Sequence, residues 1–262
     1  MANASRFDGL ARNYAQFRPS YPAAIFEQIR GLVAPAALNS GALLIDVGCG
    51  TGISTRLLRA AFGSAPESRV VGLEPSDEMR AQAITGTAAA DRIEYLPGVA
   101  ESFPFPDGSA AVVMAAQAAH WFDRPRFYAE AARVLVPGGV VALVYNNRRW
   151  QDDPFQEDYE RLVERLSPGY QRAYRDFAFA TELEATGFFA PTQESHVDWQ
   201  RPITRDEFLG MSFSTTYISN AIEASSREAV EAEINSVWAK HLNADEILSV
   251  PYRTELFAAR RV

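Results

Sequence analysis

The first 145 residues alternate between short apolar runs and longer segments whose apolar residues recur with helical spacing. Continuous apolar runs of this length are typical of strands buried on both faces of a parallel sheet. The expected strands are Ala42–Ile45 leading into Asp46, Arg69–Glu74, Asp91–Leu96, Ala110–Ala116 and Val140–Tyr145. The helices expected between them include Ile53–Phe62, a helix carrying Met79, and Arg124–Leu135. This alternation predicts a doubly wound α/β sheet with crossovers of one hand.

The pattern changes after residue 145, where charged amphipathic segments dominate. Helices are expected at Pro154–Leu166, Gln171–Ala185 and Arg227–His241, and strands at Glu194–Arg201 and Tyr252–Ala259. Thr204-x-x-Glu207 has the spacing of a capping box, which predicts that another helix begins there. Pro137-Gly138-Gly139 predicts a turn before the fifth strand.

Glycines follow the first strand at Gly48, Gly50 and Gly52. Glycine lets the backbone turn sharply and approach a ligand without a Cβ atom in the way. The turn leads into a helix whose first N–H groups lack partners, so the sequence predicts a nucleotide-cofactor site at the carboxyl end of the strand. The alternative is a glycine turn that only links strand to helix.

The chemistry of this turn separates the possible cofactors. The third glycine comes one residue too early for the dinucleotide spacing G-x-G-x-x-G, and no Lys-Ser/Thr pair follows as in a P-loop. Asp46 at the strand tip would repel a pyrophosphate and attract the ammonium group of a cofactor that carries an amino acid. S-adenosylmethionine has that ammonium group. A nicotinamide oxidoreductase is disfavoured for the same reasons.

Glu74 ends the second strand 28 residues after Asp46, about one βαβ unit later. A carboxylate at that place can accept both ribose hydroxyls of an adenosyl group. Ser76 or Asp77 could cap the next helix, and Met79 could pack on the adenine.

Composition narrows the class of protein. The 262 residues are 47% hydrophobic, and no apolar run approaches the ~18 residues of a membrane helix. Cys49 is the only cysteine and the N-terminus lacks a signal pattern, so a cytoplasmic location without membrane contact is expected.

The net charge is −8 and Lys240 is the only lysine, which disfavours nucleic acid as a partner. A monomer or homodimer is expected. His196 and His241 have no partners at metal-ligand spacing, so no metal site is predicted.

Several motifs, in their order, resemble class I S-adenosylmethionine-dependent methyltransferases. They are LLIDVGCGTG, VVGLEPSDEM, GVAESFPFPDGS, QAAHWFD and RVLVPGG. More closely, the chain is similar to the small-molecule type 11 group that includes trans-aconitate-methyltransferase-like proteins, also at YAQFRPSYP and VPYRTELFAARR. The resemblance implies a Rossmann-like, mostly parallel sheet of seven strands with an antiparallel last strand and a helical lid. It implies one domain over 1–262, with a cofactor-binding core at 36–146, a lid at 1–35 and a helical roof at 147–247.

The resemblance also implies roles for individual residues. Asp46, Gly48 and Gly50 would hold the methionine part of the cofactor, with Cys49 in the same turn, and Glu74 would bind the ribose. Adenine would lie beside Pro75, Ser76, Met79, Ala100 and Glu101. Gln117 would lie beside the cofactor's amino group. The family often has Asp where this chain has Val99, and also at the position of Ala111.

Tyr14 and Arg18 are four residues apart, so on a helix they share one face. That helix either packs on the domain or forms a lid over cofactor and substrate. His120 is the first candidate for a general base and Tyr14 the second, although His120 could simply shape the pocket.

The acceptor could be a carboxylate paired with Arg18, Arg148 or Arg149, or a flat heterocycle methylated on nitrogen or oxygen. The residues expected to contact it are Tyr14, Trp121, Trp150, Phe213 and Tyr217. A non-catalytic S-adenosylmethionine-binding regulator is the alternative to an enzyme.

Overall fold

The computed structural model describes residues 17–38, 41–63, 68–172, 177–242 and 247–262. Its centre is a seven-stranded sheet of order β3-β2-β1-β4-β5-β7-β6. The strands are β1 Leu43–Val47, β2 Arg69–Leu73, β3 Ile93–Leu96, β4 Ala110–Ala116, β5 Leu135–Arg148, β6 Gln193–Ile203 and β7 Leu248–Arg260. Strands β1 to β5 pair in parallel, while β7 is antiparallel to both β5 and β6. The predicted sheet with an antiparallel last strand is therefore confirmed.

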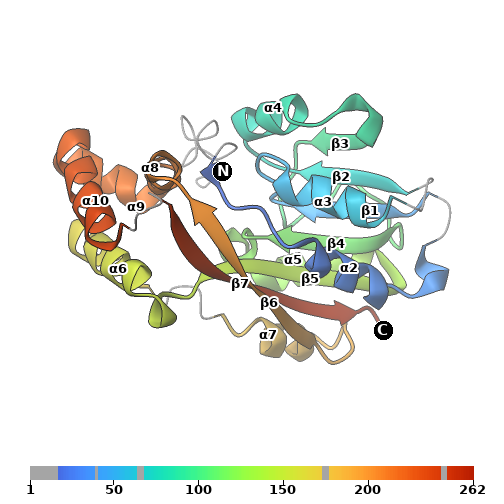
Figure 1. The fold of residues 1–262 in the computed structure, drawn as a ribbon. Helices are drawn as coiled ribbons and strands as arrows, with labels where there is room; N and C mark the ends of the chain where they lie inside the picture. Colours follow the sequence, from blue (N-terminus) through green and yellow to red (C-terminus); the bar gives the residue numbers. More distant parts are fainter. Residues whose placement is uncertain (1–16, 39–40, 64–67, 173–176, 243–246) are drawn as a thin grey trace.

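Helices cover both faces of the sheet because its central strands are apolar on both sides. Leu43, Ile45 and Val47 of β1 join the core beneath α5 (Arg124–Val134) and α7 (Phe179–Ala185). Leu44 faces the other core, which α2 (Ala23–Leu32) and α3 (Ile53–Ala61) complete. Figure 1 shows α2 and α3 against the sheet. The alternation along β1 is the period of two expected of a strand between two layers.

A second group of helices forms a roof at one end of the molecule (Figure 1). They are α6 Pro154–Leu166, α8 Arg205–Phe213, α9 Thr216–Ala224 and α10 Arg227–His241. They share a separate core with the first part of β7, built around Tyr159, Phe208 and Trp238. The capping box predicted at Thr204 and Glu207 is present and begins α8.

The structure differs from the sequence prediction at the turn before the fifth strand, at the start of the last strand and in the helix predicted at 171–185. The predicted turn at 137–139 lies inside β5, where the partner on β4 shifts from Ala110 opposite Leu135 to Val112 opposite Val140. This bulge is stabilised from the other side, because Gly138 N–H donates to Arg261 O at 3.1 Å. Strand β7 begins at Leu248 instead of residue 252, because its residues 248–258 pair with β6. Within the described part of 171–185, only Phe179–Ala185 is helical.

The parallel register places the carboxyl ends of β1, β2 and β4 at one edge of the sheet. Asp46 lies opposite Gly72 on one side and Met114 on the other. The residues that follow these strands therefore meet above the sheet, where open α/β folds bind their ligands. Helix α4 (Asp77–Thr85) starts at the same edge, and Ser76 caps it by accepting the Met79 N–H at 3.3 Å. No helix in the described ranges is long and apolar enough to cross a membrane.

Candidate functional site

The glycine turn after β1 takes a backbone path that requires glycine. Gly48, Gly50 and Gly52 all have positive φ, between +55° and +77°. A Cβ atom on Gly48 would lie 2.7 Å from the Cβ of Ala118, whereas a Cβ atom on Gly50 would have nothing within 4 Å. Gly48 therefore allows close packing against the end of β4, and Gly50 faces open space.

Glu74 holds the turn from the end of β2. One carboxylate oxygen accepts the Gly50 N–H at 2.9 Å, and the other accepts the Ser76 N–H at 2.9 Å. Only 9% of the residue is exposed, and burial raises its pKa, while the two backbone donors favour the charged form. Each oxygen of a carboxylate accepts more than one hydrogen bond, so Glu74 can still receive hydroxyl donors from a ligand.

Asp46 lies beneath the turn and is fully buried. Its Oδ2 atom accepts hydrogen bonds from Ser54 Oγ and Thr55 Oγ1, both at 2.7 Å. Among the described residues, its Oδ1 atom has no hydrogen-bond partner. Burial raises the pKa of Asp46 from 3.8 to about 6, against the two hydroxyl donors, which lower it. A buried carboxylate oxygen without a donor is costly, which points to a ligand that supplies one.

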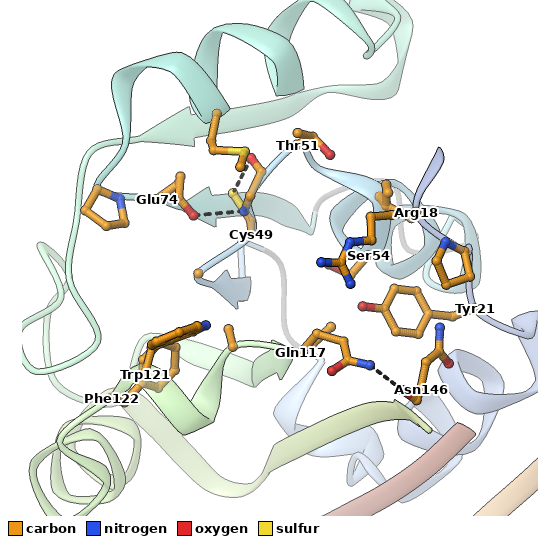
Figure 2. A pocket seen from close by; sticks show the side chains of 18 residues that line it. Arg18, Tyr21, Cys49, Thr51, Ser54, Glu74, Gln117, Trp121, Phe122 and Asn146 are labelled. Atoms are coloured by element: carbon orange, nitrogen blue, oxygen red, sulfur yellow. Dashed lines mark hydrogen bonds between the residues drawn. The ribbon is translucent and has the colours of Figure 1, made fainter. Parts of the chain in front are cut away.

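A pocket opens above these residues, and Figure 2 shows its side chains around one space. Its far wall comes from the end of β4, where Gln117 has φ +55°, a conformation uncommon outside glycine. Gln117 Nε2 donates to the Asn146 carbonyl at 2.7 Å. The side chain of Asn146 in turn donates to Ser20 O at 3.0 Å. The ends of β4 and β5 thus hold the N-terminal segment, with Arg18 and Tyr21, against the pocket.

The structure brings together most, but not all, of the predicted cofactor residues. In the pocket wall are Arg18, Gly48, Cys49, Gly50, Glu74, Pro75, Met79 and Gln117. Asp46 lies beneath the wall. Ala100 is buried in the sheet core, and Glu101 accepts the Asp123 N–H at 2.9 Å, so neither lines this pocket. Val99, one residue before Ala100, lines a separate groove with Pro75 and Phe103.

A second cavity of about 530 Å³ adjoins the first and shares Arg18, Gln117 and Trp121 with it. The aromatic residues in its wall are His120, Trp121, Tyr170, Phe177 and Tyr217. Thr215, Thr216 and Asn220 complete the wall on the side of α9. We call it the aromatic cavity.

The residues predicted to contact the acceptor do not all meet there. Trp121 and Tyr217 line the aromatic cavity. Phe213 is buried in the roof with Arg227 stacked 4.1 Å from its ring centroid. Trp150 packs under Arg172, beside a different, polar cavity. Tyr14 lies outside the described residues.

Two arginines proposed for a carboxylate are occupied elsewhere. Arg148 pairs with Glu160 at 2.6 Å, and Arg149 pairs with Asp152 and Asp198. Neither lines the aromatic cavity. Arg18 does line it, and it donates to the Ser214 carbonyl at 3.3 Å.

The segments 7–21 and 145–150 were expected near the acceptor, but Tyr21, Asn146 and Tyr145 were not predicted individually as site residues. Asn146 directly follows the apolar run of the fifth strand, so its place at a strand tip was a signal that could have been used. Tyr21 and Tyr145 carry no such signal, because their roles depend on packing between distant segments. In the described part of the chain, no group of three or more His, Cys, Asp or Glu side chains is arranged to hold a metal ion.

Comparison with known proteins identifies the relatives of this chain. Residues 45–143 match the family described as methyltransferase domain. An uncharacterized methyltransferase of Mycobacterium tuberculosis is 30% identical over 244 residues, which are 92% of this chain and 89% of the other. A Dictyostelium discoideum protein assigned as a methyltransferase is 32% identical over 138 residues, about half of its length.

Solved structures share the fold. One from Anaeromyxobacter dehalogenans, assigned as a type II methyltransferase, has a TM-score of 0.67 at 25% identity and covers 93% of this chain and 98% of its own. Phosphoethanolamine N-methyltransferase 2 of Haemonchus contortus, solved with S-adenosyl-L-methionine, has a TM-score of 0.53 at 18% identity. That match covers 99% of this chain and 57% of the other.

Proposed function

This chain belongs to the class I S-adenosylmethionine-dependent methyltransferases, and on that premise we propose that it methylates a small flat molecule bound in the aromatic cavity. The methyl donor is S-adenosylmethionine. Family membership removes the nicotinamide oxidoreductase that the glycine turn left open. It also favours an enzyme over a regulator that only binds the cofactor.

The residues around the glycine turn fit S-adenosylmethionine. A Cβ atom would meet nothing beside Gly50, so the backbone there is open to a ligand. Glu74 can accept ribose hydroxyls without releasing the two backbone N–H groups that it already holds. The buried Oδ1 atom of Asp46 lacks a donor among the described residues, and an ammonium group would supply one. We therefore assign Glu74 to the ribose and Asp46 with Gly50 to the amino-acid end.

Bound S-adenosylmethionine supplies a methyl carbon that is already activated by its sulfonium. The protein must then hold the acceptor in line with that carbon and keep water out. Such positioning accounts for about 7–11 kcal/mol of barrier reduction in well-oriented reactions. The two cavities are suited to this task because Arg18, Gln117 and Trp121 belong to both walls.

The observation that carries the proposal is the composition of the aromatic cavity. Five aromatic side chains line it, and a volume of about 530 Å³ suits a small molecule. Arg148 and Arg149 are paired outside its wall, which weakens the case for a carboxylate acceptor. A flat ring with a hydroxyl or N–H nucleophile fits such walls better than an aliphatic acid.

The test is a methyl-transfer assay with the full chain and radiolabelled S-adenosylmethionine. One set of acceptors contains phenols and N–H heterocycles, and the other contains aliphatic carboxylic acids, including trans-aconitate. We expect turnover with members of the flat set. Turnover confined to the aliphatic acids would refute the flat acceptor. It would indicate that Arg18 pairs with the carboxylate of the acceptor.

Trp121→Ala should lower kcat/KM for a flat acceptor about tenfold, because it removes a large ring from the wall that both cavities share. Trp150→Ala is the matched control, since its ring packs under Arg172 and lines neither cavity. Steady-state kinetics on both variants provides the measurement. Equal losses in the two variants would contradict the placement of the acceptor.

Glu74→Gln should weaken S-adenosylhomocysteine binding about tenfold or more. The glutamine amide can accept only one of the two backbone N–H groups, and its NH₂ group would face the other donor. Isothermal titration calorimetry gives the affinity. Arg69→Gln, on the exposed side of the same strand, should bind like the wild type. An unchanged affinity in Glu74→Gln would remove Glu74 from the cofactor site.

A further inference from the structure

We propose that Tyr145 is a positioning residue for His120, fixing the imidazole with its unprotonated Nε2 atom toward the acceptor. The inference rests on the proposed function, because it assigns the proton acceptor of the same aromatic cavity. His120 lines that cavity, while Tyr145 lies on β5 behind it and is 1% exposed.

A single phenol oxygen contacts both the backbone and the ring of His120. Tyr145 Oη accepts the His120 backbone N–H at 3.0 Å and lies 3.2 Å from His120 Nδ1. The backbone contact fixes the short 3-10 helix 119–121, and the ring contact fixes how the imidazole is turned within it. Because both contacts end on one buried atom, the ring cannot rotate without breaking the second of them.

The ring contact can be made by either of two tautomers, and the proposed role requires the one with its proton on Nδ1. In that tautomer Nδ1–H donates to the phenol oxygen at 3.2 Å, whereas a Tyr145 hydroxyl that donated to Nδ1 would put the imidazole proton on Nε2. The phenol oxygen has two lone pairs, so it can accept from the backbone N–H and from Nδ1–H together. With the proton on Nδ1, the Nε2 atom on the other edge of the ring is a base.

Neighbouring rings hold the imidazole in this orientation. Phe177 lies nearly parallel to it, at 16° and 6.1 Å between centroids, and Trp121 lies 4.7 Å away. Tyr145 itself packs against Phe179 at 5.0 Å. These rings restrict how the imidazole can turn, and the Tyr145 hydroxyl adds the contact at Nδ1 that fixes the ring within them.

The proton balance of the transfer is then complete. A lone pair on the acceptor oxygen or nitrogen forms the new bond to the methyl carbon, while the carbon–sulfur bond breaks and leaves its electron pair on sulfur. The acceptor's proton moves to His120 Nε2. The imidazolium keeps its Nδ1–H on Tyr145 Oη and later releases the Nε2 proton to water.

The test compares Tyr145→Phe with Tyr128→Phe. Tyr128 is also buried and also uses its hydroxyl in a hydrogen bond, donated to Glu182 at 2.9 Å, but it lines neither cavity. With a flat acceptor, Tyr145→Phe should lower kcat at least tenfold and leave KM for S-adenosylmethionine within twofold. Tyr128→Phe should keep its kcat. In a His120→Ala background, Tyr145→Phe should have no further effect on kcat.

A second measurement requires no acceptor. Nitrogen-15 NMR of the complex with S-adenosylhomocysteine should show His120 with its proton on Nδ1, and Tyr145→Phe should populate both tautomers. A wild-type proton on Nε2, or an unchanged kcat in Tyr145→Phe, would overturn the proposal. If no acceptor were turned over, the proposed function would fail in its assay, while the NMR result would still decide the role of Tyr145.

Discussion

Replacing Glu160 with alanine should lower the free energy of unfolding by about 3–5 kcal/mol, the usual cost of leaving a buried charge without its partner. Arg148 and Glu160 are joined at 2.6 Å, and their side chains are only 10% and 3% exposed. Glu160 also accepts the Tyr170 hydroxyl at 2.7 Å, so the substitution takes the shared carboxylate away from two buried or half-buried groups. Denaturation with guanidinium chloride, followed by tryptophan fluorescence, measures the change.

Two further variants distinguish the effect of burying the two charges on stability from the effect of pairing them. Glu94→Ala breaks the Arg69–Glu94 pair, whose side chains are 60% and 49% exposed, and should cost less than about 1 kcal/mol. The double variant Arg148→Met/Glu160→Leu should recover most of the stability lost in Glu160→Ala, because it removes both charges at once. A loss below about 1 kcal/mol in Glu160→Ala would show that water reaches the Arg148 guanidinium.

This ion pair joins the sheet to the roof. Arg148 is the last residue of β5, Glu160 lies on α6, and the guanidinium stacks 5.1 Å from the ring of Tyr159. Tyr170 and Tyr217, which line the aromatic cavity, both have their hydroxyl groups close to this pair. The rings of these tyrosines therefore form the cavity wall, while their polar ends are held behind it.

The elements that sequence predicted best are those specified locally. The limits of α6 and α10 and the capping box at Thr204 agree with the sequence pattern, since apolar spacing and capping residues lie within each segment. The bulge in β5 and the early start of β7 were missed. Both depend on hydrogen bonds to distant strands, which no local pattern records.

The site residues also fall into those that the sequence places correctly and those whose position depends on distant packing. The glycine turn and Glu74 were predicted because strand tips in a parallel sheet meet at one edge, and both prove to be in contact. Trp150 and Phe213 were expected at the acceptor because they are aromatic and near the roof. Their partners, Arg172 and Arg227, come from segments whose packing the sequence does not show, and these partners hold them outside the aromatic cavity.

Asp46→Asn should change how the stability of the protein depends on pH. Burial raises the pKa of Asp46 from 3.8 to about 6, so between these values the folded state keeps a proton that the unfolded state has released. Wild-type stability therefore falls as pH rises from 4 to 7, by roughly 2.5 kcal/mol relative to Asp46→Asn. Asp198→Asn is the control: arginine partners lower the pKa of Asp198 to about 2, so it adds no pH dependence above pH 4.5.

The same substitution should weaken S-adenosylhomocysteine binding at pH 7 by about tenfold or more, because it removes the charge assigned to the ammonium group. Wild-type affinity should then fall about tenfold between pH 7 and pH 5, as Asp46 takes up its proton, and calorimetry across this range measures it. Most of this pH dependence of the affinity should vanish in Asp46→Asn. The remainder belongs to Glu74, because burial raises the pKa of that residue too.

If Asp46→Asn bound as tightly as the wild type, yet showed the altered stability profile, the carboxylate would serve the turn through Ser54 and Thr55 and not the ligand. The two profiles together therefore separate a structural carboxylate from a cofactor-binding one.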